Sequence, residues 1–141
     1  MKQQIAKWFA WLKQATSQED EQLAYVYSDG TQLWATNGYV LHAVDVATET
    51  RGHATLTDAG LLAVEAADDI PPFTATLPTG DPIASIVVSA ESLKQAVAGQ
   101  EGFVQLNLYT TDQSLELQSA GKYALVSPVA EVPGWWFWRP K

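Results

Sequence analysis

Cysteine is absent from this chain of 141 residues, which excludes a disulfide framework and thiol chemistry and is compatible with a reducing compartment. Long apolar runs are lacking too. The apolar residues near the N-terminus are interrupted by Gln3, Gln4, Lys7 and Lys13, so no run reaches the length of a signal-peptide core or a membrane span. We therefore expect no membrane association and a cytoplasmic location.

Basic residues are scarce, with 8 Lys and Arg against 16 Asp and Glu and a net charge of −8. This balance excludes a protein whose whole surface binds nucleic acid. The charge is unevenly spread, however, because residues 1–18 hold three lysines and no acid, so the rest of the chain carries −11. A hydrophobic fraction of 47% is typical of a globular protein, and the length suits one domain.

Motifs for catalysis and metal binding are also missing. The sequence has no phosphate-binding glycine loop, nucleophile elbow or zinc motif. His42 and His53 do not have the spacing of metal ligands. Asp68 and Asp69 are adjacent, so on an extended chain their side chains point apart. We expect no enzymatic activity, no cofactor and no metal.

The first element that the pattern predicts is a helix over residues 3–16. Its apolar residues recur at i, i+3, i+4 and i+7, which is one stripe of a 3.6-residue period; they are Ile5, Trp8, Phe9 and Leu12. Trp11 falls at the edge of this stripe. Lys7 and Gln14 fall on the opposite face, with Gln3 and Ala10 beside them and Lys2 and Lys13 on the flank.

Strands are expected next. Residues 23–27 and 31–36 predict a hairpin around Asp29-Gly30, where a type I′ turn needs positive φ at both central positions. Asn37-Gly38 predicts a second turn before a strand at 39–46. In the segment 48–82 we expect a hairpin of strands 54–56 and 60–65, an acidic loop at 66–72 and a short strand at 73–77.

The sequence of the last third of the chain predicts a strand at 84–88 and a helix at 90–98. Ser89 is expected as the N-cap of this helix and Gly99 as its stop, with Leu93 and Val97 facing inward. Three strands follow, with turns at 111–113 and 120–122. Helix and three strands thus occur twice. The predicted class is α+β, with two helix-plus-antiparallel-strand units and both helices on one face of the sheets.

Several segments together resemble a domain of the bacterial DNA polymerase III β sliding clamp. They are Leu33-Trp34-Ala35-Thr36-Asn37-Gly38-Tyr39-Val40-Leu41, Ile86-Val87-Val88-Ser89 with Leu93, Val104 with Leu106, Leu115 with Leu117, Gly121, and Val132-Pro133-Gly134-Trp135. Residue 37 is Asn where that family has Asp. The resemblance implies a single DNA-clamp-like domain over residues 1–141, with an inserted segment at about 48–82. Clamp subunits contain three such domains, and this chain has room for one.

The resemblance also implies that both helices face DNA phosphates. The DNA-facing candidates are Lys2, Gln3, Lys7, Lys13, Gln14 and Lys94. Binding to double-stranded DNA would be weak and salt-dependent, since few phosphates are contacted. The alternative is that these lysines only keep the surface of the first helix solvated. The second helix suits contact with DNA phosphates poorly, because Glu91 and Gln95 occupy its outward face. A homo-oligomeric ring would need edge strands that pair, such as residues 115–119.

The C-terminal aromatic cluster is the second candidate site. Trp135, Trp136, Phe137 and Trp138 cannot all pack inward from one strand, because successive side chains alternate between faces. They would bind a partner, such as a replication protein, or else close the core of their own domain. Two functions follow: a clamp-like domain that supports DNA replication through DNA or polymerase association, or a protein-interaction module with a clamp fold that no longer slides on DNA. A third, for which only the length of segment 48–82 speaks, is a small-molecule binding domain that uses this segment.

Overall fold

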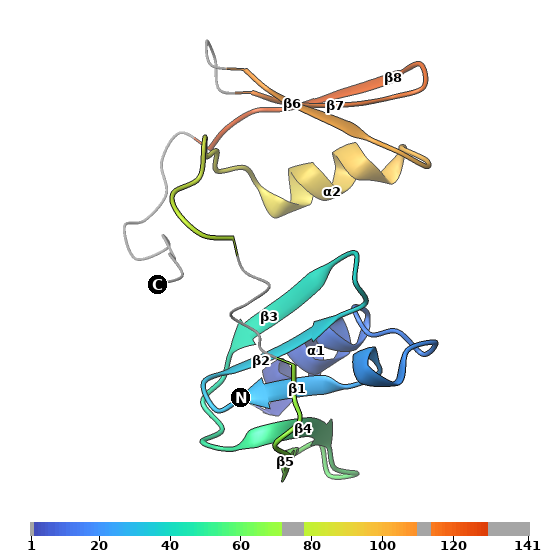
Figure 1. Cartoon of the computed structure of the whole chain (residues 1–141). Helices are drawn as coiled ribbons and strands as arrows, with labels where there is room; N and C mark the ends of the chain where they lie inside the picture. The colour runs from blue at the N-terminus through green and yellow to red at the C-terminus, as the bar shows by residue number, and fades with distance from the viewer. Residues whose placement is uncertain (1, 72–77, 110–113, 130–141) are drawn as a thin grey trace. The chain divides into compact units, whose positions relative to one another are not determined.

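The computed structural model describes residues 2–71, 78–109 and 114–129, with side chains from residue 4 onward. These residues form two α-helices and two antiparallel sheets, of five and three strands, which confirms the α+β class. The chain divides into two compact units, Met1–Thr79 and Gly80–Lys141, each with one helix and one sheet (Figure 1). The placement of both helices on one face, across the two units, stays a prediction.

Helix α1 (Lys2–Lys13) opens the first unit, close to the range that the periodicity predicts. Its apolar stripe packs on the sheet: Phe9 and Leu12 are buried together with Ala15, against Val26 and Leu33. A 3-10 turn, η1 (Glu21–Leu23), follows, and its N-cap Asp20 accepts a hydrogen bond from the backbone N–H of Gln22. This turn replaces the start of the strand predicted at 23–27, so β1 begins only at Val26.

The first sheet has the strand order β3-β2-β1-β4-β5, and all neighbours are antiparallel. Its strands are β1 (Val26–Asp29), β2 (Gln32–Thr36), β3 (Leu41–Asp45), β4 (Arg51–Leu56) and β5 (Leu62–Ala66). The first four form a Greek key, because β4 returns to lie beside β1. The hairpin predicted at 54–65 is present, with β4 starting three residues earlier. Segment 48–82 therefore contributes two strands to this sheet.

The two tight turns of this sheet are built alike. The last residue pairs before the turns are Ser28 with Leu33 and Thr36 with Leu41, so each turn contains a glycine, Gly30 or Gly38. In each turn only the glycine has a positive φ, so the type I′ prediction for Asp29-Gly30, which needs a positive φ at both central residues, is wrong. In each turn the Asp or Asn side chain accepts two backbone N–H groups, from the second and third residues after it.

The second unit begins with residues 80–88, which form no strand, so the strand predicted at 84–88 is wrong. The backbone N–H of Val129 donates to the carbonyl of Val87 at 2.8 Å, but this contact does not amount to a strand ladder. Helix α2 (Ala90–Ala98) is present as predicted. Ser89 caps it by accepting from the N–H of Ser92, and Gly99 is its C-cap.

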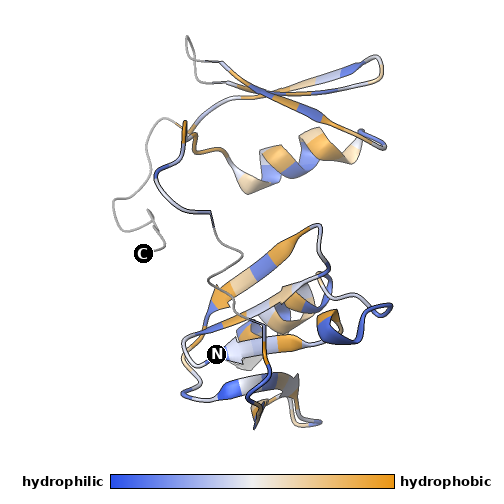
Figure 2. Ribbon diagram, viewed as in Figure 1, coloured by the Kyte–Doolittle hydropathy of each residue, from blue (hydrophilic) through white to orange (hydrophobic). Residues whose placement is uncertain are grey.

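The second sheet consists of β6 (Gln105–Leu108), β7 (Leu115–Ser119) and β8 (Lys122–Val126), in that order. Hydrophobic and hydrophilic residues alternate along β6 and β7 (Figure 2). Strand β7 is central, so the expectation that residues 115–119 form a pairing edge is wrong; β6 and β8 are the edges. Leu117 and Val126 are buried, Leu93 is half-buried, and Val97, which was expected to face inward, is exposed.

Three predictions fall outside the described residues. They are the strand at 73–77, the turn at 111–113 and the environment of the aromatic cluster at 135–138.

Close packing of β4 on β5 gives a stability prediction. Gly52 in β4 pairs with Ala66 in β5, and a Cβ on Gly52 would lie 1.9 Å from the backbone oxygen of Glu65. Gly52→Ala therefore forces the two strands apart. We expect it to lower the free energy of unfolding by about 3 kcal/mol, measured by urea denaturation followed by far-UV circular dichroism.

Gly99→Ala is the matched control. No atom lies within 4 Å of a Cβ at Gly99, and its φ of −92° is open to any residue. We expect a change of less than about 0.5 kcal/mol. Equal stability of the two variants would contradict the close approach of β4 to β5.

Candidate functional site

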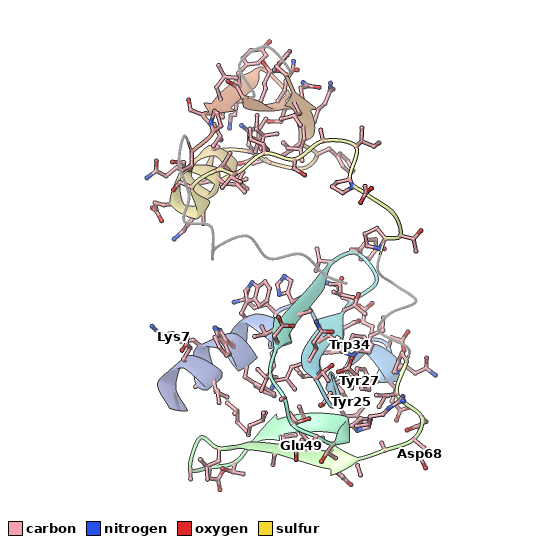
Figure 3. The ribbon with its side chains drawn as sticks, turned by 90° about the vertical axis from the view of Figure 1, so that its left-hand side faces the viewer. Lys7, Tyr25, Tyr27, Trp34, Glu49 and Asp68 are labelled. Atoms are coloured by element: carbon pink, nitrogen blue, oxygen red, sulfur yellow. The ribbon has the colours of Figure 1, made fainter. Side chains whose placement is uncertain are left out.

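The exposed face of α1 carries the basic residues that the sequence singles out. Because Phe9 and Leu12 are buried against the sheet, Lys7, Lys13 and Gln14 are left exposed. Figure 3 shows Lys7 pointing away from the sheet. No acidic residue occurs in α1, and Lys13 lies in its last turn, where the helix dipole favours a positive charge. This face is therefore a local positive surface on an acidic chain.

The remaining DNA-facing candidates are placed differently. Lys2 and Gln3 belong to α1, but their side chains lie outside the described part. Lys94 is exposed on α2, which belongs to the second unit. Its neighbours on that helix, Glu91 and Gln95, are exposed as well, and the Gln95 amide lies 3.5 Å from a Glu91 carboxylate oxygen. The positive surface that the structure shows thus consists of α1 residues.

A stacked pair of rings fixes the end of α1 to the edge strand β3. The rings of Trp11 and His42 are 3.9 Å apart and nearly parallel, at 8°. His42 Nδ1 lies 2.8 Å from the carbonyl oxygen of Trp11, an acceptor in the last turn of the helix. Since a carbonyl can only accept, Nδ1 carries the proton and donates. His42 therefore holds helix to sheet, while Trp11 remains 43% exposed.

The opposite face of the sheet holds an aromatic cluster that sequence reasoning missed. Tyr25, Tyr27, Trp34 and His53 form it (Figure 3 labels the first three). The rings of Tyr25 and His53 stack at 4.3 Å, and Tyr27 meets the ring of His53 edge-on. Ile70 covers Tyr27 and Trp34, which are buried. The available signal was the period-two spacing of Tyr25 and Tyr27 around the inward-facing Val26.

Tyr27 has an altered acidity in this cluster. Its hydroxyl donates a hydrogen bond to the carbonyl oxygen of Gln22, and only 4% of the residue is exposed. Burial raises the pKa of Tyr27 above its usual value of 10.0, and the negative charge of Asp69 raises this pKa further. The phenol is thus held neutral, in a structural role that ties η1 to β1.

The histidines and acids do not converge on a metal site. His42 pairs with Ala35 on the α1 side of the sheet, and His53 pairs with Tyr27 on the other side. In the described part of the chain, no three His, Asp or Glu side chains are grouped so that they could hold a metal ion. Within the same residues, no helix has the length and apolar character needed to cross a membrane.

No protein-family model matches the chain, and no curated protein or solved structure is significantly similar to it. The resemblance to sliding clamps thus depends on the short motifs and on the order of the elements.

The raised pKa of Tyr27 predicts how stability changes at alkaline pH. Tyr27→Phe removes the hydrogen bond to Gln22 and is expected to cost about 1 kcal/mol at neutral pH. In the wild type, the unfolded chain loses the phenol proton from about pH 10, before the folded chain does. Stability therefore falls as the pH rises from 10 toward the raised pKa. The variant lacks this loss, so the stability difference between the two proteins shrinks above pH 10.

Urea denaturation at a series of pH values measures this difference. Tyr39→Phe is the control, because Tyr39 is almost fully exposed. A stability difference between wild type and Tyr27→Phe that stays constant across the alkaline range would contradict the assignment.

Proposed function

We propose that this chain is a non-catalytic domain of the DNA-clamp type that associates with double-stranded DNA and supports DNA replication. The observation that carries the proposal is the exposed surface of the acid-free helix α1, with Lys7 on its outer face, Lys13 on its flank and Gln14 directly after its end. Lysine and glutamine side chains suit contacts with phosphate oxygens, directly or through water.

The order of the elements supports the clamp-type assignment. In each unit a helix precedes three strands that pair as an antiparallel meander: α1 precedes β1-β2-β3, and α2 precedes β6-β7-β8. The segment that most resembles a clamp, Trp34-Ala35-Thr36-Asn37-Gly38, spans the end of β2 and its turn. We infer that the two units are related halves of one clamp-like domain.

The proposed contact carries no sequence information, as movement along DNA requires. Only a few phosphates lie within reach of one helix, and the rest of the chain is acidic. A Kd on the order of 1–100 µM at low salt is therefore expected, with strong weakening as salt is added. Duplexes of the same length and different sequence should bind equally.

Charge reversal on α1 tests the proposal. Lys7→Glu and Lys13→Glu together should abolish binding to a fluorescein-labelled duplex, measured by anisotropy at low salt. Replacing both by Gln should reduce the slope of log K against log salt by about 2, since two phosphate contacts are lost.

Arg51→Glu is the matched control, because Arg51 is an exposed cation of the same unit that lies on β4, away from α1. It should bind DNA nearly as the wild type does. Equal loss in the Arg51 variant, or no loss in the double α1 variant, would contradict a contact made by α1.

A protein-interaction module is the second candidate, and exposed apolar side chains on the second sheet favour it. Leu106 is 62% exposed, and Tyr123 and Leu125 are each 68% exposed. Tyr123 and Leu125 lie on the same face of β8, the face on which β7 carries Gln118 and Glu116. Apolar residues rimmed by polar ones mark interaction surfaces. The partner of this module would be a replication protein or a second copy of the chain.

The two candidates predict different results. Under the second, duplex DNA does not bind even at low salt, and reversal of the α1 lysines changes nothing. The chain then forms an oligomer that Tyr123→Ser and Leu125→Ser convert together to a monomer, measured by size-exclusion chromatography with light scattering. DNA binding by a strict monomer would support the first candidate instead.

A further inference from the structure

The first unit contains an apolar groove beside α1 that shares only Lys13 with the proposed DNA contact. The sheet is five strands wide, but α1 packs on β1, β2 and β3. The helix-side residues of β4, Ala54 and Leu56, border the core on which α1 packs, and a space remains open to solvent beside them. A groove of about 530 Å³ results. Its described lining comes from α1, from residues 24–26 and from the end of β4.

Small side chains explain why the groove is hollow. Ala6 and Ala10 line it from the helix, Ala24 lines it from the chain before β1, and Ala54 lines it from β4. None of these side chains reaches across the space between helix and sheet. Phe9, Val26 and Leu56 supply larger apolar walls. A volume of this size lies within the range of sites that bind small molecules.

The groove carries charge of one sign only among its described residues. Lys13 is the only charged residue among the described residues that line it, and no carboxylate does. This is unusual in a chain of net charge −8. An apolar space with one ammonium group at its wall favours a ligand with an apolar body and one negative charge.

We propose that this groove binds a small amphipathic carboxylate, with its aliphatic chain between α1 and β4 and its carboxylate paired with the Lys13 ammonium. Such a ligand covers the apolar surface that remains open beside β4. It also gives Lys13 a charge-assisted hydrogen bond. This inference does not rest on the proposed DNA contact, and it assigns a binding role to part of segment 48–82.

Titration calorimetry of the full chain with decanoate, below its micellar concentration, tests the site. Saturable binding of one decanoate per chain is expected. Lys13→Gln should weaken it roughly fivefold, as for a partly exposed ion pair. Ala10→Phe should weaken it at least about tenfold, because the added ring fills the groove while residue 10 is exposed and tolerates a larger side chain. Lys7→Gln, which does not touch the groove, should bind as the wild type does.

Two further measurements distinguish decanoate from other occupants of the groove. Decyltrimethylammonium, with a similar chain and the opposite charge, should bind more weakly than decanoate; equal binding would overturn the charge selection. If Ala10→Phe turned a dimer into a monomer while decanoate failed to bind, the occupant would be a second copy and the proposal would be overturned.

Methyl chemical shifts of the wild type give a measurement that needs no variant. The methyl groups of Ala10 and Ala54 face the groove from opposite walls and should shift on addition of decanoate. Absence of saturable binding, or shifts confined to other residues, would overturn the proposal. Because no DNA is present, failure here leaves the DNA contact untouched, and failure of DNA binding leaves this site untouched.

Discussion

The burial of the apolar stripe of α1 on the first sheet is the interaction on which the rest of the first unit depends. Phe9 and Leu12 reach from the helix into a core with Val26 and Leu33, and Ala15 extends that core just beyond the helix end. Burial of this stripe supplies most of the stability of such a short helix, because an isolated helix of this length is marginal in water. The stacked rings of Trp11 and His42 then fix its C-terminal end to β3.

The two surfaces to which a function is proposed follow from that one packing arrangement. With the apolar stripe turned inward, Lys7, Gln14 and Lys13 must face solvent, and they form the positive surface proposed to contact DNA. With the helix seated over β1 to β3, a space remains open beside the end of β4, and the small residues there leave a groove beside Lys13. In the two proposals, the lysines of this helix meet two different kinds of anion. The second unit repeats the order of a helix and three strands, with the helix capped by Ser89.

Elements with a local signal could be predicted from the sequence, and elements that depend on tertiary contacts could not. The stripe of α1, the cap at Ser89 and the turn at Asn37-Gly38 are encoded within a few residues. The β-branched run Ile86-Val87-Val88 predicted a strand, but a strand also needs a partner, and the described second sheet contains β6, β7 and β8 alone. The start of β4 was missed because Gly52 reads as a strand breaker, although it is needed where the backbone of Glu65 comes close. At the candidate site, the exposed lysines followed from periodicity, whereas the aromatic cluster and the groove required the pairing of β1 with β4.

Chemical-shift mapping of the ¹⁵N-labelled chain with duplex DNA at low salt tests the central claim most directly, since it reports which face of α1 meets the DNA. The account predicts shifts concentrated on the backbone and side chains of Lys7, Lys13 and Gln14 that disappear as salt is added. Shifts confined to the exposed apolar residues of the second sheet, or no shifts at all, would contradict it.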